Sequence, residues 1–173
     1  AAMQLAEQGR LDIDQPLRNY VPGFEIKTRY PDTAEITPRH LMAHHSGLPR
    51  DRMKGFFTYS PPSSYTEVAE YLREEYTAYP PNQFFSYSNL GITLLGHAIQ
   101  NQSRMSYTDY MRQSVLTPLG MTNSSFDTGL ATSTLMAKGH KARATAIEPF
   151  LRDLPAGGLN SNVTDMSRFM AMV

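Results

Sequence analysis

Apolar residues recur at the spacing of a helix in several separate stretches of the chain. Intervals of three and four residues place apolar side chains on one face of an α-helix, which can then be buried. The pattern is clearest in residues 89–101, whose inward positions are Leu90, Leu94, Leu95, Ala98 and Ile99. Shorter stretches, read together with start and stop signals, predict further helices over residues 1–8, 38–45, 64–72, 106–117 and 162–173.

Capping residues mark where three of these helices begin. Thr37 stands directly before Pro38, and proline is a favoured first residue of a helix. Ser64 is followed three residues later by Glu67, which is the spacing of a capping box, and Ser106 begins a similar box.

Glycines refine the picture at four positions. Gly9 and Gly47 follow helical stretches, and we expect them to close those helices in the left-handed conformation that glycine adopts easily. Gly91 and Gly96 lie inside the helix over residues 89–101. Each costs about 1 kcal/mol relative to alanine there, so we expect close packing against another backbone.

The rest of the chain is loop, with few strand signals. Only residues 83–87 and 124–127 resemble strands, so the sequence predicts a helical layer with little sheet. The longest connection covers residues 48–63, a length that is usually functional or mobile. Its aromatic residues are Phe56, Phe57 and Tyr59. They either line a cleft or anchor the loop.

Each end of the chain lacks one of the signals that a helix normally has. Residues 1–8 form a helical stretch with no capping residue before it. The last stretch begins well, with Asn162 as a cap and Asp165 in the first turn, but it has no stop signal. We therefore expect residues 1–173 to be a single partial domain, cut inside a helix at both ends. The segment that starts at Ala1 is not a targeting signal.

Composition excludes several classes of function. The 173 residues carry 16 Lys and Arg against 16 Asp and Glu, and this balance argues against a nucleic-acid partner. The absence of cysteine excludes a disulfide framework, thiolate zinc sites and a cysteine nucleophile. No apolar stretch is long enough to be a transmembrane segment. Motifs of nucleotide binding, of α/β-hydrolases and of zinc proteases are also absent, and no cofactor is expected.

Two groups of residues invite a chemical interpretation that a structural one outweighs. His40 and His44 are four residues apart on a predicted helix, which is the spacing of a metal-binding pair. No suitable third ligand stands nearby, so we expect both to be structural and predict no metal. Ser46 adjoins His45 but precedes Gly47, so we interpret it as a small turn residue and not as an activated nucleophile.

The candidate chemistry lies in Tyr87 and Asn89, two residues apart on a loop that leads into the helix over residues 89–101. In extended backbone this spacing puts both side chains on one side. A phenol and a carboxamide converging at the start of a helix can serve proton transfer and recognition of a substrate amide. The alternative is a buried tyrosine beside a capping asparagine. Spacing alone does not separate these two interpretations.

Five blocks add context, namely residues 3–14, 36–49, 85–96, 116–121 and 155–166. In this order they resemble the serine β-lactamase and penicillin-binding-protein family, particularly its branch of class C β-lactamases, D-aminopeptidases and esterases. The resemblance implies an α+β fold, of which this chain is the mainly helical portion of a β-lactamase/transpeptidase-like fold, with most of the antiparallel sheet domain missing. It also implies hydrolysis through an acyl-serine, in which a serine takes the acyl group of an amide, an ester or a β-lactam and passes it on to water.

The same resemblance assigns roles to single residues. Tyr87 corresponds to the tyrosine that relays protons, and Asn89 to the side chain that binds the substrate amide. The family's Ser-x-x-Lys and Lys-Thr-Gly motifs are absent from this chain. His45-Ser46-Gly47 matches the variant His-x-Gly by letters, but it precedes Tyr87, so we treat it as a coincidence.

These absences limit what the chain does alone. We expect the 173 residues to be inactive by themselves and the full-length protein to be a serine hydrolase with a small-molecule or peptide substrate. The alternative is a β-lactamase-like binding or scaffolding protein without catalysis. Family members are often periplasmic or otherwise in the cell envelope, which is the location that the resemblance implies; the cytoplasm is the alternative. The oligomeric state is not predicted.

Overall fold

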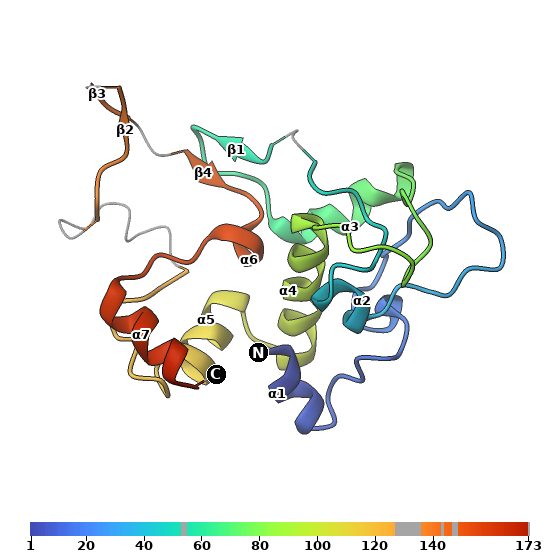
Figure 1. The fold of residues 1–173 in the computed structure, drawn as a ribbon, viewed down its shortest axis with the longest axis horizontal. Coiled ribbons are helices and arrows are strands. Elements are labelled where there is room, and N and C mark those ends of the chain that lie inside the picture. Colours follow the sequence, from blue (N-terminus) through green and yellow to red (C-terminus); the bar gives the residue numbers. More distant parts are fainter. Residues whose placement is uncertain (53–54, 127–135, 143, 147–148, 173) are drawn as a thin grey trace.

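The computed structural model describes residues 1–52, 55–126, 136–142, 144–146 and 149–172, and helices dominate it (Figure 1). The helices are α1 (Ala2–Glu7), α2 (Pro38–Met42), α3 (Val68–Tyr71), α4 (Asn89–Ser103), α5 (Tyr107–Met111), α6 (Leu154–Gly157) and α7 (Val163–Met172). The strands are β1 (Phe57–Thr58), β2 (His140–Lys141), β3 (Ala144–Thr145) and β4 (Phe150–Leu151). The expected helical portion of an α+β fold is confirmed.

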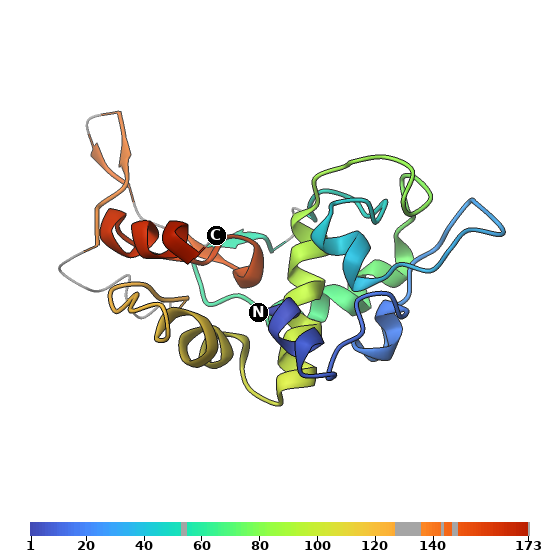
Figure 2. The ribbon, with the colours of Figure 1, turned by 60° about the horizontal axis from the view of Figure 1, so that its bottom comes forward.

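The strands form two small antiparallel ladders. In one, Phe57 of β1 pairs with Leu151 of β4, which joins segments far apart in the sequence. In the other, His140 of β2 pairs with Thr145 of β3. The β2–β3 ribbon projects from the body of the molecule (Figures 1 and 2). Neither ladder covers a helix layer, so the core is built by helices.

Helix α4 is the centre of that core. It contacts α1, α2 and α3 along one side and α5 and α6 along the other (Figure 1). All five of its expected inward positions are buried: Leu90, Leu94, Leu95, Ala98 and Ile99. Helix α7 lies beside α5 (Figure 2). The periodicity in the sequence therefore identified the central element correctly.

The expected helix starts are confirmed in detail. The Thr37 side chain accepts a hydrogen bond from His40 N, and the His40 ring accepts one from Thr37 N, so the capping box is complete. Ser106 Oγ accepts from the backbone N of Asp109 at 3.1 Å. At α7, Asn162 Oδ1 accepts from Asp165 N at 2.9 Å. Each cap pairs a backbone donor that the helix cannot satisfy itself.

Helix ends differ from the expectation. The helix expected over residues 38–45 stops at Met42, because His44 already has a φ of +55°. The stretch 64–72 begins with a 3-10 turn and is α-helical only in α3. Residues 106–117 change from α-helix to a π-helical turn at Arg112. Propensity and capping fix the first turn, whereas tertiary contacts decide how far each helix continues.

The two glycines inside α4 have different surroundings. A Cβ on Gly96 would stand 2.3 Å from Cγ of Pro155 in α6, so close packing is confirmed there. The partner is a side chain and not the expected backbone. At Gly91 the nearest atoms beyond its own helix backbone are 3.5 Å away or farther, an ordinary contact, so the expectation is wrong at that position.

Strands are not where the sequence suggested them. Residues 83–86 and Tyr87 form turn and extended loop without a ladder partner, since their backbone bonds go to the turn after α2. Ser125 forms one isolated bridge with Asn160, and residue 127 lies outside the described residues. Helix α6 was not expected, because its four residues include a proline and a glycine and it is held by its long-range contact with α4.

The two end helices are confirmed over the described residues. α1 begins at Ala2 with no side-chain cap and is followed by Gly9 at a φ of +67°. α7 continues to Met172, and Val173 lies outside the described residues. Of the helices that the structure describes, none is both long and apolar enough to cross a membrane.

Candidate active site

The loop before α4 is held from its middle residue. Ser88 is fully buried, and its Oγ accepts a hydrogen bond from Gly91 N at 3.0 Å, which caps the helix. The same hydroxyl donates to the carbonyl O of Pro49 at 2.7 Å. The backbone N of Asn89 donates to the carbonyl O of Arg50 at 2.9 Å. The start of α4 is thereby docked on residues 49–50.

Tyr87, directly before this cap, keeps 44% of its surface exposed. Its ring lies 4.4 Å from the ring of His44, centroid to centroid, and the Arg50 guanidinium lies 5.7 Å from its centroid. Among the described residues, no hydrogen bond engages its hydroxyl. The arrangement fixes the ring and leaves the phenol group available to a further partner.

Asn89, directly after the cap, is half-buried. Its Nδ2 donates to Oδ1 of Asp51 at 2.7 Å. Asp51 in turn pairs with Nε of Arg50 at 3.2 Å. Tyr87 and Asn89 are therefore joined through neighbours, one over the Arg50 guanidinium and the other at the Asp51 carboxylate.

We expect Tyr87 and Asn89 to lie at the rim of a cleft with their side chains converging, and this stays a prediction. A cavity of ≈ 450 Å³ lies elsewhere, among loop residues that include Phe24, Ile36 and Thr77. Of the aromatic residues in the 48–63 loop, Phe57 and Tyr59 are exposed and Phe56 is half-buried against Phe57. Their proposed part in a cleft likewise remains a prediction.

His44 supports the loop on the other side. Its carbonyl O accepts from Ser86 N at 2.8 Å, and its Nδ1 accepts from Ser88 N at 3.2 Å. The edge of its ring also meets Phe85, with centroids 5.8 Å apart. Burial, and to a smaller degree the neighbouring His45, lower the pKa of His44 below its usual value. The neutral ring that can accept a hydrogen bond is thus favoured.

The structural interpretation of the remaining histidine and serine candidates is confirmed. Nδ1 of His40 accepts from the backbone in the capping box, and Nδ1 of His44 accepts from Ser88. The residues that the structure describes contain no group of three His, Cys, Asp or Glu able to hold a metal ion. Ser46 is buried, and its Oγ accepts from Leu48 N at 3.3 Å, as expected of a turn residue.

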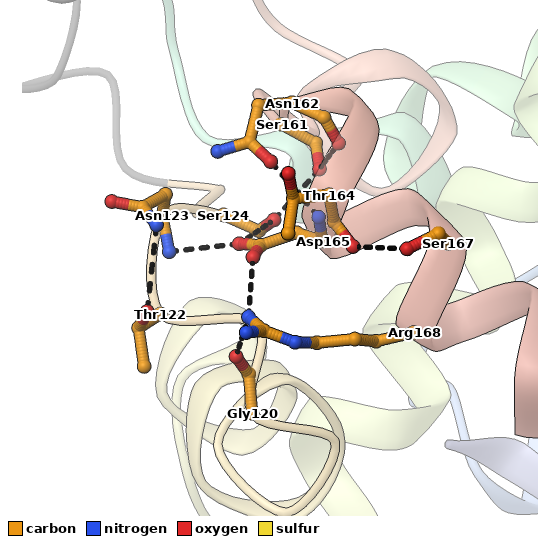
Figure 3. Close-up of polar contacts among 10 residues, drawn as sticks. All are labelled: Gly120, Thr122, Asn123, Ser124, Ser161, Asn162, Thr164, Asp165, Ser167 and Arg168. Atoms are coloured by element: carbon orange, nitrogen blue, oxygen red, sulfur yellow. Dashed lines mark hydrogen bonds and ion pairs between the residues drawn. The ribbon is translucent and has the colours of Figure 1, made fainter.

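A second polar cluster surrounds Asp165, which is fully buried in α7 (Figure 3). Its Oδ2 accepts from the backbone N of Asn123 and from Oγ of Ser124, each at 2.8 Å. Its Oδ1 accepts from Arg168 at 2.9 Å, and Arg168 also donates to the carbonyl O of Gly120. The partners come from α7 itself and from residues 120–124, which follow the π-helical turn. The cluster fastens the helix to residues 120–124 and exposes no reactive group.

Sequence reasoning missed several residues of the site. It identified Tyr87 and Asn89 but gave Ser88 no role, although a serine three residues before Gly91 is itself a capping signal. It expected His44 to be structural but did not connect it with Tyr87. Arg50 and Asp51 gave no signal in the sequence, because their contacts arise only when the 48–52 loop is laid against the start of α4.

Comparisons with known proteins show the family and the fold of this chain. A family model described as Beta-lactamase matches residues 1–173. "Beta-lactamase-like protein 2" of Dictyostelium discoideum is 31% identical over 96% of this chain and 32% of that protein. The octameric penicillin-binding protein homologue from Pyrococcus abyssi superposes with a TM-score of 0.76 and 31% identity, over 98% of this chain and 41% of that one.

A further likeness concerns the fold alone. A class C β-lactamase superposes with a TM-score of 0.77 at 21% identity, over 97% of this chain and 45% of that one. The chain spans less than half the length of each of these three proteins. What it resembles is therefore one part of a larger domain.

Proposed function

Because the chain belongs to the β-lactamase family, we propose that it is part of a serine hydrolase that acts through an acyl-serine on an amide, an ester or a β-lactam. Relatives in this family are hydrolases. The observation that carries the proposal is the loop before α4. It holds the ring of Tyr87 between His44 and Arg50 while leaving the phenol hydroxyl without a partner among the described residues.

In this proposal Tyr87 exchanges a proton with the serine nucleophile and the leaving group. A general acid–base group must not be tied up elsewhere, and the exposed phenol of Tyr87, without a hydrogen-bond partner among the described residues, supports this role. The nucleophile and its lysine are not among the 173 residues, since no Ser-x-x-Lys is present. We therefore propose that residues 1–173 alone do not turn over substrate.

Asn89 has the complementary role of binding the substrate amide. Its Nδ2 is occupied by Asp51 at 2.7 Å, which leaves its Oδ1 to accept a hydrogen bond from a substrate N–H. An ester has no such donor. The orientation of Asn89 therefore favours substrates with an amide beside the reacting carbonyl.

The rival function is a binding or scaffolding protein of the same fold without catalysis. The absence of Ser-x-x-Lys from this chain is the observation that favours it. The two functions make different statements about the full-length protein, because only an enzyme needs the Ser-x-x-Lys motif elsewhere in its sequence. Determining the full-length sequence and its turnover separates them.

The direct test is Tyr87→Phe in the full-length protein. The change removes the hydroxyl and keeps the ring on His44, so turnover of a chromogenic β-lactam or a p-nitrophenyl ester should fall about 10²–10⁴-fold. The melting temperature should stay the same. Tyr79→Phe is the matched control, because Tyr79 is also exposed, at 40%, and packs on Phe84. Equal turnover in wild type and Tyr87→Phe would reduce Tyr87 to a packing residue.

A further inference from the structure

Three contacts join His44 to three consecutive residues of the site loop. Its carbonyl O accepts from Ser86 N at 2.8 Å, its ring lies 4.4 Å from the ring of Tyr87, and its Nδ1 accepts from Ser88 N at 3.2 Å. The first contact comes from the backbone and the other two from the imidazole. No other residue described in the structure engages all three.

We propose that His44 is a positioning residue for Tyr87, whose backbone and imidazole together hold the phenol in its working orientation. The inference rests on the proposed function, because only that function gives the orientation of Tyr87 a role. The holding contacts themselves can be tested without turnover. The role does not require His44 to touch substrate, since its ring contacts and its carbonyl bond are made with residues 85–88.

The backbone conformation of His44 makes this arrangement possible. Its φ is +55°, in the left-handed region that few residues other than glycine and asparagine occupy readily. The turn brings its carbonyl and its ring to the same stretch of loop. Residues 85–88 have no ladder partner of their own, so the backbone donors of Ser86 and Ser88 depend on His44.

The ring can accept from Ser88 only while Nδ1 carries no proton. Protonation turns both ring nitrogens into donors, which breaks this bond. Several groups surround the imidazole: His45 follows it in the turn, Phe85 and Tyr87 lie against it, and the Arg50–Asp51 pair lies around Tyr87. Burial and His45 lower the pKa of His44. Loss of the bond should therefore appear only on the acid side of neutrality.

Two substitutions of His44 separate its contributions. His44→Asn keeps an acceptor at the position of Nδ1, because Oδ1 of asparagine is the same number of bonds from Cβ, and asparagine tolerates a positive φ. It lacks the ring that packs on Tyr87. His44→Gly suits the backbone and removes both ring contacts. His45→Asn is the matched control, since the Nδ1 of His45 is bonded only to the carbonyl O of Ala43.

In the full-length protein we expect kcat/KM to fall about 10–100-fold in His44→Gly, because misplacing a reacting group by about 1 Å has an effect of that size. His44→Asn should lose less. It should also lack the acid limb of the wild-type pH profile that protonation of His44 causes, because its amide does not titrate. His45→Asn should keep the acid limb, moved to somewhat higher pH because the neighbouring histidine no longer lowers the pKa of His44. A His44→Gly protein with wild-type kcat/KM would overturn the inference.

A nuclear magnetic resonance titration tests the holding contacts independently of catalysis. In wild type, the Ser88 amide and the Tyr87 ring signals should move together with the His44 ring signals as the pH falls. In His44→Asn they should not. This experiment needs no turnover, and its wild-type part does not depend on the folding of any variant. A Ser88 amide that ignores the titration of His44 overturns the inference, whereas wild type without any turnover overturns the proposed function instead.

Discussion

Tyr87, Ser88 and Asn89 follow one another in the chain but have three different surroundings. Ser88 is fully buried and makes two structural hydrogen bonds, whereas Tyr87 is 44% exposed and Asn89 is half-buried. Extended backbone sends alternate side chains to opposite sides, so a middle residue that points inward forces its two neighbours outward together. The spacing of the candidate pair is thus a consequence of where Ser88 must go.

Asn89→Ala should distinguish amide from ester substrates. The change removes the Oδ1 that we propose accepts from a substrate N–H, so kcat/KM for an amide or β-lactam should fall more than kcat/KM for a matched ester. One hydrogen bond in a binding site corresponds to about 0.5–1.5 kcal/mol, or a few-fold to tenfold. Side-by-side kinetics on the two substrates measure the difference. Equal losses would mean that Asn89 acts on the fold and not on the amide.

At Gly47 the conformation and the surroundings both require glycine. Its φ is +71°, and a Cβ would lie 2.0 Å from the carbonyl O of Tyr79. Gly9 has a similar φ of +67°, with nothing within 4 Å of a Cβ. The two positions therefore share the backbone penalty and differ only in the collision.

We expect Gly9→Ala to lower the free energy of unfolding by about 1–2 kcal/mol, which is the penalty of the left-handed conformation. Gly47→Ala should lower it by several kcal/mol more, because the backbone of residues 78–79 must move. Urea unfolding of both variants measures the difference. Similar losses of unfolding free energy in the two variants would show that the backbone at Tyr79 moves away at little cost.

Between elements, the contact of α4 with α6 depends on one absent side chain. Pro155 occupies the space that a Cβ on Gly96 would need, at 2.3 Å, while Gly91 in the same helix has only ordinary contacts. A helix tolerates glycine at a cost in its own stability when the missing side chain lets a neighbour approach. Gly96 therefore lowers the stability of α4 itself but allows α6 to pack against it.

Gly96→Ala should destabilise the protein by about 1–3 kcal/mol, the usual effect of overpacking. Gly91→Ala is the matched control and should be neutral or stabilise by up to about 1 kcal/mol, since alanine favours helix. Adding Pro155→Gly to Gly96→Ala should recover part of the loss. Unfolding in denaturant measures all three, and equal stabilities of Gly91→Ala and Gly96→Ala would contradict the assigned contact.

Elements were predictable where their signals are local. The starts of α2, α5 and α7 follow from Thr37, Ser106 and Asn162, whose hydrogen bonds are made within their own first turn. The end of α2 depends on the left-handed turn at His44. Contacts with a distant loop stabilise this turn, for example the hydrogen bond from Ser88, which lies 44 residues further along the chain. Such long-range contacts leave no pattern in a window of sequence, and α6 was missed for the same reason.

For the molecule as a whole, half-buried imidazoles should make stability depend on pH. Burial is the largest cause that lowers the pKa of His40, His44 and His97 below the usual 6.5. Below pH 6.5 the unfolded chain binds protons at these residues that the folded protein does not yet bind, so the free energy of unfolding falls as the pH falls. At and above neutral pH this contribution is fully present.

The melting temperature should therefore be lower at pH 5 than at pH 7. This window lies above the range in which the carboxylates with lowered pKa values, such as Asp14 and Glu67, lose their own contributions. His97→Gln removes one of the three groups, and its melting temperature should change less with pH than that of wild type. Circular dichroism melts at both pH values provide the measurement. A melting temperature independent of pH over this range would refute the linkage.

The sequence predicts more of the overall architecture than of the site. Helical periodicity around residues 89–101 and three local caps were enough for a helical layer built on α4, and ordered motifs pointed to the family. The site required more, because the partners of Tyr87 and Asn89 are Arg50, Asp51 and His44. These residues come from a separate loop and turn, and only the folded chain brings them together.

The burial of Ser88 has a consequence for how this protein can evolve. Replacing the buried serine disturbs the start of the central helix, whereas replacing Tyr87 or Asn89 removes a chemical group and leaves the cap intact. A lineage that no longer needs turnover is thus free to change Tyr87 and Asn89 while selection for folding still retains Ser88. Enzymes and inert descendants of one ancestor can then share the same scaffold, and the residues on either side of the serine record which path each lineage took.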